Sequence, residues 1–334
     1  SKIYSMQPKN GSGNLNHTEY RPLEGFVLAV TPFNFTSIAS NLCMTPVLMG
    51  DVMVWKPSTT ALLSNYHLMQ LYKEAGLPEG VINFLPGSGA LIGRVCMQSK
   101  HFAGIHFTGS TATFKSLWKE ACSNLDRYIS YPRLVGETGG KDFIFVHPTA
   151  DEKAVATAAF CGAFEYQGQK CSAASRMYIP KSLWPAVLKN MKMGDVRDPF
   201  NYINAVIDET SFDKIASYIN YAKESKDAKI VLGGRCDKTV GYFVEPTIIE
   251  TSDPHFKSME EEIFGPVITV YPYDDDKMEE TVTLCDETSP YGLTGSVFAQ
   301  DRLAAERIAD SLCYAAGNFY INDKPTGAVV GQQP

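Results

Sequence analysis

The chain has 334 residues, of which 44% are hydrophobic and 20% are charged, and its formal net charge is −7. These are ordinary values for a globular chain that is long enough to form two domains. The acidic balance, without a stripe of Lys and Arg, argues against a nucleic-acid-binding protein. The apolar runs have the length of strands and fall far below the roughly 20 residues that span a bilayer.

Eight cysteines and six histidines are scattered along the chain. The cysteines form no CxxC pair and a chain of this size needs no disulfide for stability, so we expect a reducing compartment. His101 and His106 lack the i, i+4 spacing of helical zinc ligands, and we predict no metal site. Seven cysteines are interpreted as core or surface thiols, with Cys171 as the exception.

Residues 1–21 contain the run Asn10-Gly11-Ser12-Gly13-Asn14 between two polar stretches. This pattern indicates a loop or a hairpin that has no apolar face of its own. A disordered leader is the alternative, because Gly, Ser and Asn are frequent here. The first residues show no signal-peptide or transit-peptide pattern, so targeting cannot be read from them.

From residue 22 onward, short apolar runs alternate with amphipathic stretches. The alternation predicts a parallel sheet with helices on both faces, which is a candidate dinucleotide scaffold although its fingerprint departs from GxGxxG. The predicted strands are 25–30, 52–56, 81–85 and 104–107, and the predicted helices are 37–49, 60–75, 90–99 and 112–123.

Two features at the ends of these strands are candidates for cofactor binding. Lys56 ends a strand, so its ammonium group should lie at the carboxyl edge of the sheet, where open α/β folds bind ligands. A solvated surface lysine is the alternative. The run Gly109-Ser110-Thr111-Ala112-Thr113 follows a strand and begins a helix, whose N–H groups and dipole can receive a pyrophosphate.

A second α/β unit is predicted after Lys141, with the domain boundary near Gly139-Gly140. Its expected strands are a run from Phe143 to Val146 and the ranges 176–179, 229–232, 243–249 and 293–298. Its expected helices are 151–165, 181–191, 211–225 and 302–312.

Cys171 is the candidate nucleophile. It follows Gly168-Gln169-Lys170, a flexible polar approach that lets the sulfur face a cleft as a thiolate. A small buried thiol is the more frequent role of a lone cysteine. Upstream, Glu137 lies in Gly136-Glu137-Thr138-Gly139-Gly140, where the glycines allow other groups to approach closely. Neither residue has a histidine beside it, which argues against a cysteine protease.

Seven motifs span nearly the whole chain. Together they resemble the NAD(P)-dependent aldehyde dehydrogenase superfamily, and most closely its branch that oxidises L-glutamate γ-semialdehyde in proline catabolism. The motifs are Thr31-Pro32-Phe33-Asn34-Phe35, Trp55-Lys56-Pro57-Ser58, Phe107-Thr108-Gly109-Ser110, Gly136-Glu137-Thr138-Gly139-Gly140-Lys141, Gly168-Gln169-Lys170-Cys171-Ser172, Glu261-Glu262-Ile263-Phe264-Gly265-Pro266 and Gly331-Gln332-Gln333-Pro334.

The resemblance implies an α/β fold with three parts. These are a β-hairpin oligomerisation arm at 1–21, a Rossmann-type parallel-sheet NAD domain at 22–139 and an α/β catalytic domain at 140–334. It implies an internal fragment that lacks the start of the NAD domain and the end of the catalytic domain. The stretch between Trp184 and Gly194 is shorter than in the family. A homodimer or higher homo-oligomer is implied, in the mitochondrial matrix if the source is eukaryotic.

The resemblance also implies roles in catalysis. Cys171 would attack the aldehyde, Asn34 and the Cys171 N–H would stabilise the oxyanion, and Glu137 would activate the hydrolytic water. A turn asparagine is the alternative for Asn34. A solvated acidic cluster is the alternative for Glu262.

The implied ligands are NAD and the semialdehyde, with NADP not excluded. The cofactor would contact Thr31, Lys56, residues 109–113, Glu262 at the nicotinamide ribose and Phe264 at the ring. The substrate would contact Phe35 as a pocket wall and Ser172, Gly327 and Ala328 at its α-carboxylate. Ala328 lacks the hydroxyl that some relatives carry.

Two other functions are weighed against this one. A different aldehyde or semialdehyde dehydrogenase, including one that transfers the acyl group to CoA, would keep the fold. Glu137 argues against CoA transfer because it is suited to hydrolysis. A catalytically silent relative is the non-enzyme alternative, and the joint presence of Cys171, Glu137 and Asn34 argues against it.

Overall fold

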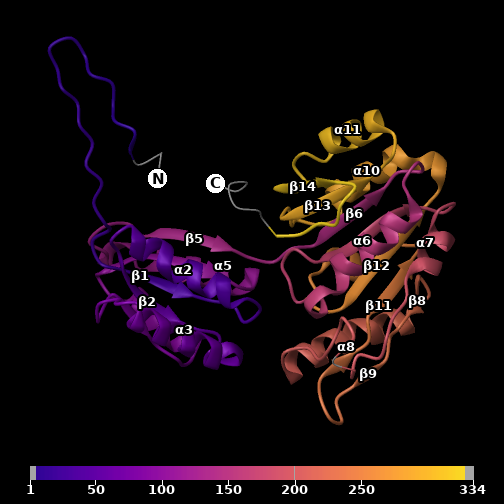
Figure 1. Cartoon of the computed structure of the whole chain (residues 1–334), viewed down its shortest axis with the longest axis horizontal. Coiled ribbons are helices and arrows are strands. Elements are labelled where there is room, and N and C mark those ends of the chain that lie inside the picture. The colour runs from indigo at the N-terminus through magenta and orange to yellow at the C-terminus, as the bar shows by residue number, and fades with distance from the viewer. Residues whose placement is uncertain (1–4, 199, 328–334) are drawn as a thin grey trace. The chain divides into compact units, whose positions relative to one another are not determined.

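The computed structural model describes residues 5–198 and 200–327 (Figure 1). The chain divides into two compact units, Ser1–Thr138 and Gly139–Pro334. Among the described residues, no helix is both long and apolar enough to cross a membrane.

The first unit contains a five-stranded sheet in the order β3-β2-β1-β4-β5, and every pairing in it is parallel. This arrangement confirms the Rossmann-type sheet predicted from the alternating pattern. The strands are β1 (Phe26–Val30), β2 (Val52–Lys56), β3 (Ile82–Phe84), β4 (Phe102–Thr108) and β5 (Arg133–Glu137). The α-helices are α2 (Thr36–Leu48), α3 (Leu62–Glu74), α4 (Gly89–Met97) and α5 (Thr111–Ser123), with 3₁₀ turns at Thr59–Ala61 and Leu125–Arg127.

Two apolar clusters pack against this sheet. Side chains of α2 and α3, including Leu42 and Met69, surround Trp55 of β2. Side chains of α4 and α5, including Met97, pack with Phe107 of β4 in the other cluster. Both faces of the sheet are therefore covered, which leaves its edges and strand ends for binding.

The second unit contains a seven-stranded sheet in the order β14-β13-β6-β7-β12-β11-β8. Its pairings are parallel except that β8 runs antiparallel to β11. The strands of the unit are β6 (Asp142–Val146), β7 (Ala174–Pro180), β8 (Ala228–Leu232), β9 (Cys236–Asp237), β10 (Phe243–Val244), β11 (Thr247–Thr251), β12 (Val267–Tyr273), β13 (Thr294–Phe298) and β14 (Asn318–Ile321). The helices are α6 (Glu152–Phe164), α7 (Trp184–Asn190), α8 (Glu209–Glu224), α9 (Lys257–Glu260), α10 (Met278–Glu287) and α11 (Arg302–Ser311), with 3₁₀ turns at Glu165–Gly168 and Asp275–Lys277.

Arg176 of β7 is buried in the middle of this sheet. Its Nε donates to the Lys141 carbonyl at 2.8 Å, and its Nη1 donates to Tyr178 Oη at 3.1 Å and the Cys285 carbonyl at 3.0 Å. These bonds satisfy a guanidinium that would otherwise be very costly to bury. They also fix the chain where it enters β6.

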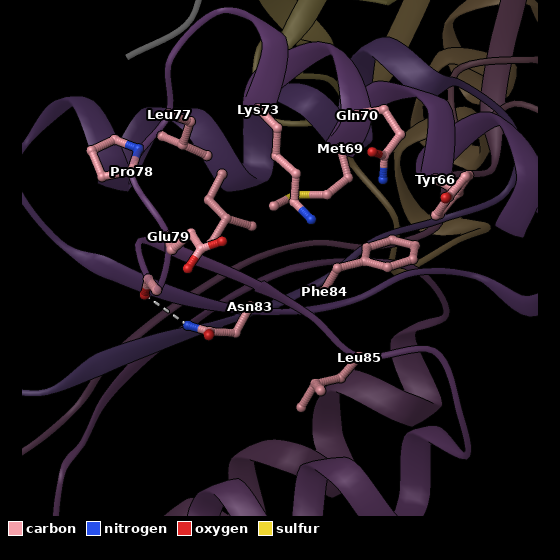
Figure 2. A pocket seen from close by; sticks show the side chains of 12 residues that line it. Tyr66, Met69, Gln70, Lys73, Leu77, Pro78, Glu79, Asn83, Phe84 and Leu85 are labelled. Carbon is pink, nitrogen blue, oxygen red and sulfur yellow. Dashed lines mark hydrogen bonds between the residues drawn. The ribbon is translucent and has the colours of Figure 1, made fainter.

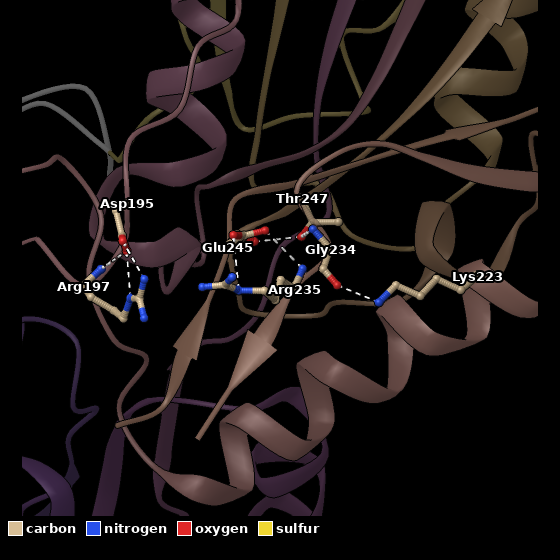
Figure 3. Close-up of polar contacts among 7 residues, drawn as sticks. All are labelled: Asp195, Arg197, Lys223, Gly234, Arg235, Glu245 and Thr247. Atoms are coloured by element: carbon tan, nitrogen blue, oxygen red, sulfur yellow. Dashed lines mark hydrogen bonds and ion pairs between the residues drawn. The ribbon is translucent and has the colours of Figure 1, made fainter. Parts of the chain in front are cut away.

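The predicted single strand 243–249 is wrong, because the structure breaks it into β10 and β11. Pro246 lies at the break and has no N–H to donate to a ladder. Polar contacts hold the turn between β8 and β9, which lies next to this break (Figure 3). Gly234 N donates to Thr247 Oγ1 at 3.1 Å, and Lys223 Nζ donates to the Gly234 carbonyl at 2.6 Å. The short β9–β10 pair is thereby tied to α8.

The N-terminal ribbon is exposed along residues 5–17 and folds back on itself. An isolated bridge joins Gly11 and Asn14. Thr18 N donates to Gln7 Oε1 at 2.9 Å, and Gln7 Nε2 donates to the Thr18 carbonyl at 3.2 Å. Its two arms are thus connected through side chains as well as through the turn.

Candidate active site

The carboxyl ends of β1, β2, β4 and β5 lie along one edge of the first sheet. Val30 pairs with Lys56, and Thr108 pairs with Glu137. The strand order reverses direction at β1, between β2 and β4, and ligands of open α/β sheets bind beside such a point. The predicted cofactor residues of this unit therefore share one edge with Glu137.

The loop after β1 holds two predicted residues firmly. Thr31 is buried, its N–H donates to the Lys56 carbonyl at 3.2 Å, and its Oγ1 accepts a bond from Trp55 Nε1 at 3.0 Å. Asn34 is also buried, and Phe35 is the extended residue that precedes α2. A buried amide side chain loses little entropy on binding a ligand.

Lys56 is half-buried, and burial lowers the pKa of its ammonium group. Its side chain lies against Gly89, where a Cβ would come within 3.5 Å of Lys56 Cε. Gly89 begins α4. A solvated surface position therefore does not describe Lys56, since its charge lies near the positive end of a helix and can receive a polar or anionic ligand.

The start of α5 presents the predicted phosphate-binding run. Ser110 caps the helix by accepting a bond from Thr113 N at 3.2 Å. Ala112 and Thr113 are exposed, whereas Thr111 Oγ1 is buried and has no hydrogen-bond partner among the described residues. A hydroxyl that is buried without a partner beside the exposed first turn of a helix fits a site for phosphate oxygens.

Phe114 shapes the surroundings of Glu137. Its ring is stacked on Phe107, with centroids 5.2 Å apart, and fills the space that a side chain at Gly136 would need. Glu137 is the last residue of β5 and is exposed. The glycine before Glu137 is thus required by aromatic packing.

The loop that carries Cys171 has a strained backbone. Tyr166, Gln167 and Gly168 have φ values of 53°, 57° and 62°, and Gly168 lies against the Gly265 carbonyl. Consecutive left-handed residues persist only where the surroundings hold them, and they are frequent at active sites. Cys171 lies three residues after Gly168 and is partly exposed.

The flanks of the Cys171 loop are pinned by polar contacts. Gln169 Oε1 accepts a bond from Ile207 N at 2.9 Å. Lys170, whose side chain is only 7% exposed, pairs with Glu165 at 2.6 Å. The polar approach to the cysteine is therefore ordered by its partners, although its sequence indicates flexibility.

Glu262 differs from the two glutamates before it. Glu260 pairs with His255, and Glu261 accepts a bond from Tyr218. Glu262 Oε1 accepts from Gly140 N at 3.1 Å, and burial raises the pKa of its carboxyl group. A solvated position thus does not describe Glu262, whereas Glu261 is exposed.

The surroundings of Glu262 include residues that the motif did not indicate. A Cβ on Gly139 would collide with its carboxylate. Lys214 Nζ donates to the Glu262 carbonyl at 2.9 Å, and burial lowers the pKa of Lys214. Phe264 has a φ of 61°, so this segment also turns through a left-handed residue. Lys214 was missed because nothing around it in the amphipathic helix α8 distinguishes it from a surface lysine.

Ser172 and Gly327 face each other. Ser172 is buried, and a Cβ on Gly327 would lie 3.9 Å from its Oγ. Tyr320 Oη donates to the Gly327 carbonyl at 3.1 Å and holds this segment, a role that the sequence did not reveal. Ala328 lies outside the described residues.

The predicted site residues therefore form two sets, one on each unit. The first holds Thr31, Asn34, Phe35, Lys56, Gly109 to Thr113 and Glu137. The second holds Cys171, Ser172, Glu262, Phe264 and Gly327. No group of three or more metal-ligating side chains occurs in the part of the chain that the structure describes.

A separate hollow of about 390 Å³ lies between α3 and β3 of the first unit (Figure 2). Tyr66, Lys73, Glu79 and Asn83 are among its lining residues. None of the predicted site residues lines it. The hollow lies beside β3, which is the edge strand of the first sheet.

Comparisons with known proteins agree with these motifs. The sequence model of the Aldehyde dehydrogenase family matches residues 2–334. The chain is 56% identical over 343 residues to the mitochondrial delta-1-pyrroline-5-carboxylate dehydrogenase of Dictyostelium discoideum, and 50% identical over 341 residues to that of Homo sapiens. It is covered completely in both, and covers 62% and 61% of these relatives. The chain thus spans about three fifths of the length of the curated relatives it matches.

Solved structures give the same result. The chain is similar to the delta-pyrroline-5-carboxylate dehydrogenase of Mycobacterium tuberculosis bound with NAD, at 48% identity and a TM-score of 0.92, over 100% of this chain and 62% of that one. It is also similar to the Thermus 1-pyrroline-5-carboxylate dehydrogenase with bound NAD, at 32% identity and a TM-score of 0.86, over 93% and 60% of the two chains.

Proposed function

Because the chain belongs to the aldehyde dehydrogenase family, we propose that it serves in the NAD-dependent oxidation of L-glutamate γ-semialdehyde to L-glutamate, a step of proline catabolism. The observation that carries this proposal is the strained, pinned loop that presents Cys171. The names of the relatives described above support the choice of substrate.

Cys171 is the nucleophile in this proposal. Its thiolate adds to the aldehyde carbon and the carbonyl oxygen becomes an alkoxide, because hydride does not leave readily from a neutral aldehyde. The Asn34 amide and the Cys171 N–H donate to this oxygen. Losing one such donor typically raises the barrier by about 2.7–4 kcal/mol.

NAD, when bound, supplies the hydride acceptor for the oxidation. The exposed start of α5 with its unpartnered Thr111 hydroxyl supports a pyrophosphate there. Thr31 and Lys56 would hold the adenosine end, Glu262 the nicotinamide-ribose hydroxyls and Phe264 the ring. NAD is preferred to NADP because the two similar structures described above were solved with bound NAD.

Glu137 acts in the second half of the reaction. The thioester on Cys171 must be hydrolysed, and neutral water is a poor nucleophile. The Glu137 carboxylate takes a proton from water, whose oxygen attacks the thioester carbon and releases the thiolate. Glutamate then leaves as the free acid.

Substrate choice rests on the pair Ser172 and Gly327, with Phe35 as an aromatic wall. A buried hydroxyl opposite a glycine backbone suits a small anionic group such as the α-carboxylate. Ala328 is included from the resemblance alone.

The proposal is tested with the complete protein that contains this chain. NADH formation is compared for glutamate semialdehyde, succinate semialdehyde and acetaldehyde. The highest kcat/KM is expected for glutamate semialdehyde. A preference for either of the others would assign the protein to a different aldehyde, and no oxidation of any would favour a silent relative.

Ser172→Ala is expected to weaken binding of glutamate semialdehyde by roughly 1.5–3 kcal/mol, the range for a hydrogen bond to a charged group. An uncharged aldehyde of equal length should be scarcely affected. The measurement is kcat/KM for both aldehydes. Equal losses for the two would contradict the anchor role.

Ala328→Ser is the companion variant. It should tighten the binding of product glutamate if its hydroxyl reaches the carboxylate.

The exposed N-terminal ribbon supports a homodimer or a higher homo-oligomer, since it has no apolar face of its own and a partner would cover it. The mitochondrial relatives support a place in the mitochondrial matrix.

A further inference from the structure

Asp142 is a buried carboxyl group at the start of β6 that the proposed chemistry does not use. It is 1% exposed. Its Oδ1 accepts bonds from Thr294 N at 2.7 Å and Thr294 Oγ1 at 2.9 Å. Its Oδ2 is buried and has no hydrogen-bond partner among the described residues. A carboxylate oxygen in this state is costly, so Oδ2 requires either a donor or a proton of its own.

Oδ2 lies beside the backbone of the nucleophile. A Cβ on Gly140 would collide both with Asp142 Oδ2 and with the Cys171 carbonyl oxygen. The two oxygens therefore crowd the same side of Gly140, and the pairing of Asp142 with Ala174 holds β6 next to the chain that leaves Cys171. Two neighbouring acceptors repel each other unless a proton lies between them.

The charged groups around Asp142 do not prevent protonation. Arg176 from β7 favours the carboxylate, and Thr294 from β13 and the Asp142 N–H donate to it. Lys141 before β6 favours the carboxylate while it is charged, but burial lowers the pKa of Lys141 to about 7. Arg176 also interacts with the Cys285 thiol of α10, and the Glu262 carboxylate accepts a bond from Gly140 N. Burial outweighs these groups and raises the pKa of Asp142 to about 7. The neutral acid thus prevails below about pH 7 and the carboxylate above it.

We propose that Asp142 is a positioning residue for the nucleophile, whose neutral carboxyl group donates Oδ2–H to the Cys171 carbonyl oxygen. The proton stays on Oδ2, and no covalent bond changes. The bond fixes the backbone whose N–H is to stabilise the oxyanion. Gly140 lacks a side chain because the bond occupies that space. The catalytic part of this inference rests on the proposed function.

Ionisation of Asp142 would replace the donor with a second acceptor. The Cys171 carbonyl would then be repelled, and the loop would lose its contact with Asp142, although Gln169 and Lys170 keep their partners. Turnover by the wild type should accordingly fall as the pH rises through the pKa of Asp142. This fall adds to the changes in turnover that other titrating groups cause. Asparagine supplies the same bond from Nδ2 at every pH, and its Oδ1 can still accept from Thr294.

The test compares Asp142→Asn with the wild type in the complete protein from about pH 6 to about pH 9. The ratio of the two kcat values removes every titration that they share. We expect the kcat of Asp142→Asn divided by the kcat of the wild type to lie within about twofold of one at the acid end. This ratio should rise by roughly threefold or more at the alkaline end. A ratio that does not change with pH overturns the inference.

Thr294→Val gives a second, opposite perturbation. It removes the Oγ1 bond, which favours the ionised form of Asp142, and leaves Oδ2 untouched. The alkaline loss of turnover should therefore move to higher pH. Asp142→Ala should lower kcat by roughly tenfold or more at all pH values, with the KM for NAD within about twofold. An unmoved alkaline limb in Thr294→Val contradicts the assignment to Asp142.

A readout without turnover separates this inference from the proposed function. Iodoacetamide labelling of Cys171 is followed by mass spectrometry, with the exposed Cys122 and Cys313 as internal references. Relative to these references, the pH dependence of Cys171 labelling should differ between wild type and Asp142→Asn. The same difference in a protein that oxidises no aldehyde would support the anchor and reject the proposed function. Identical labelling profiles in an active enzyme would reject the anchor alone.

Discussion

Cys171→Ala is expected to abolish aldehyde oxidation, with turnover falling more than about a hundredfold, because covalent catalysis has no substitute nucleophile at this position. NAD binding should be nearly unchanged, since the thiol forms the bond to the substrate and does not anchor the cofactor. The measurements are steady-state NADH formation and NAD titration by fluorescence on the same preparations.

Two buried cysteines provide matched controls. Cys43 and Cys96 are buried in the first unit, and burial raises the pKa of both thiols, for Cys96 to about 11. A thiol in such a place remains protonated and unreactive. Alanine at either position, or at the exposed Cys313, should leave the chemical step intact. Any effect of these substitutions should be on the stability of the fold. Turnover of Cys171→Ala above about a hundredth of wild type would remove Cys171 from the nucleophile role.

Glu137→Gln should separate the two halves of the reaction. The glutamine cannot take a proton from water, so thioester hydrolysis fails while hydride transfer survives. Stopped-flow absorbance should show a rapid burst of NADH, close to one equivalent per site, followed by slow turnover. Glu74→Gln changes an exposed glutamate of the same unit and should behave as wild type.

The absence of a burst would have a definite meaning. If hydride transfer and turnover were slowed together in Glu137→Gln, the carboxylate would be needed before the thioester forms. Glu137 would then be the group that activates the Cys171 thiol, and another base would have to be found for hydrolysis.

The architecture of the first unit could be predicted because its local signals agree. Each apolar run of β1, β2 and β4 is followed by a stretch of helical length, and this alternation defines a parallel sheet. The ends of elements differed by one or two residues, as they do wherever helix ends fray. β5 was not named as a strand, because Gly136 and the polar residues around it give it no apolar run.

The second unit was predicted less completely. No element was assigned between residues 250 and 292, although β12 and α10 lie there. Pro266 and Pro272 flank or interrupt the apolar run of β12, which obscures a strand in the sequence. α10 begins with an acidic turn that resembles a solvated loop.

Site residues with a motif could be named in advance, whereas those defined by distant contacts could not. Cys171 and Glu137 lie in recognisable runs, and their catalytic roles remain predictions. Asp142 gains its character from Thr294, which is 152 positions away, and Lys214 from a bond to the Glu262 carbonyl. No local pattern contains such information, because burial and hydrogen bonding arise only when the sheet has formed.

Apart from Glu165, the supports of the Cys171 loop come later in the chain than the cysteine itself. Ile207 binds Gln169, Gly265 lies against Gly168, and Lys324 joins Lys170 at Glu165. Since synthesis proceeds from the N-terminus, a ribosome must add more than a hundred further residues before the last of these partners emerges. A nascent chain therefore carries Cys171 as an ordinary thiol, and the left-handed loop forms only once the second unit is nearly complete. The order of synthesis thus leaves the Cys171 loop without most of its supports until nearly all of the second unit has been made.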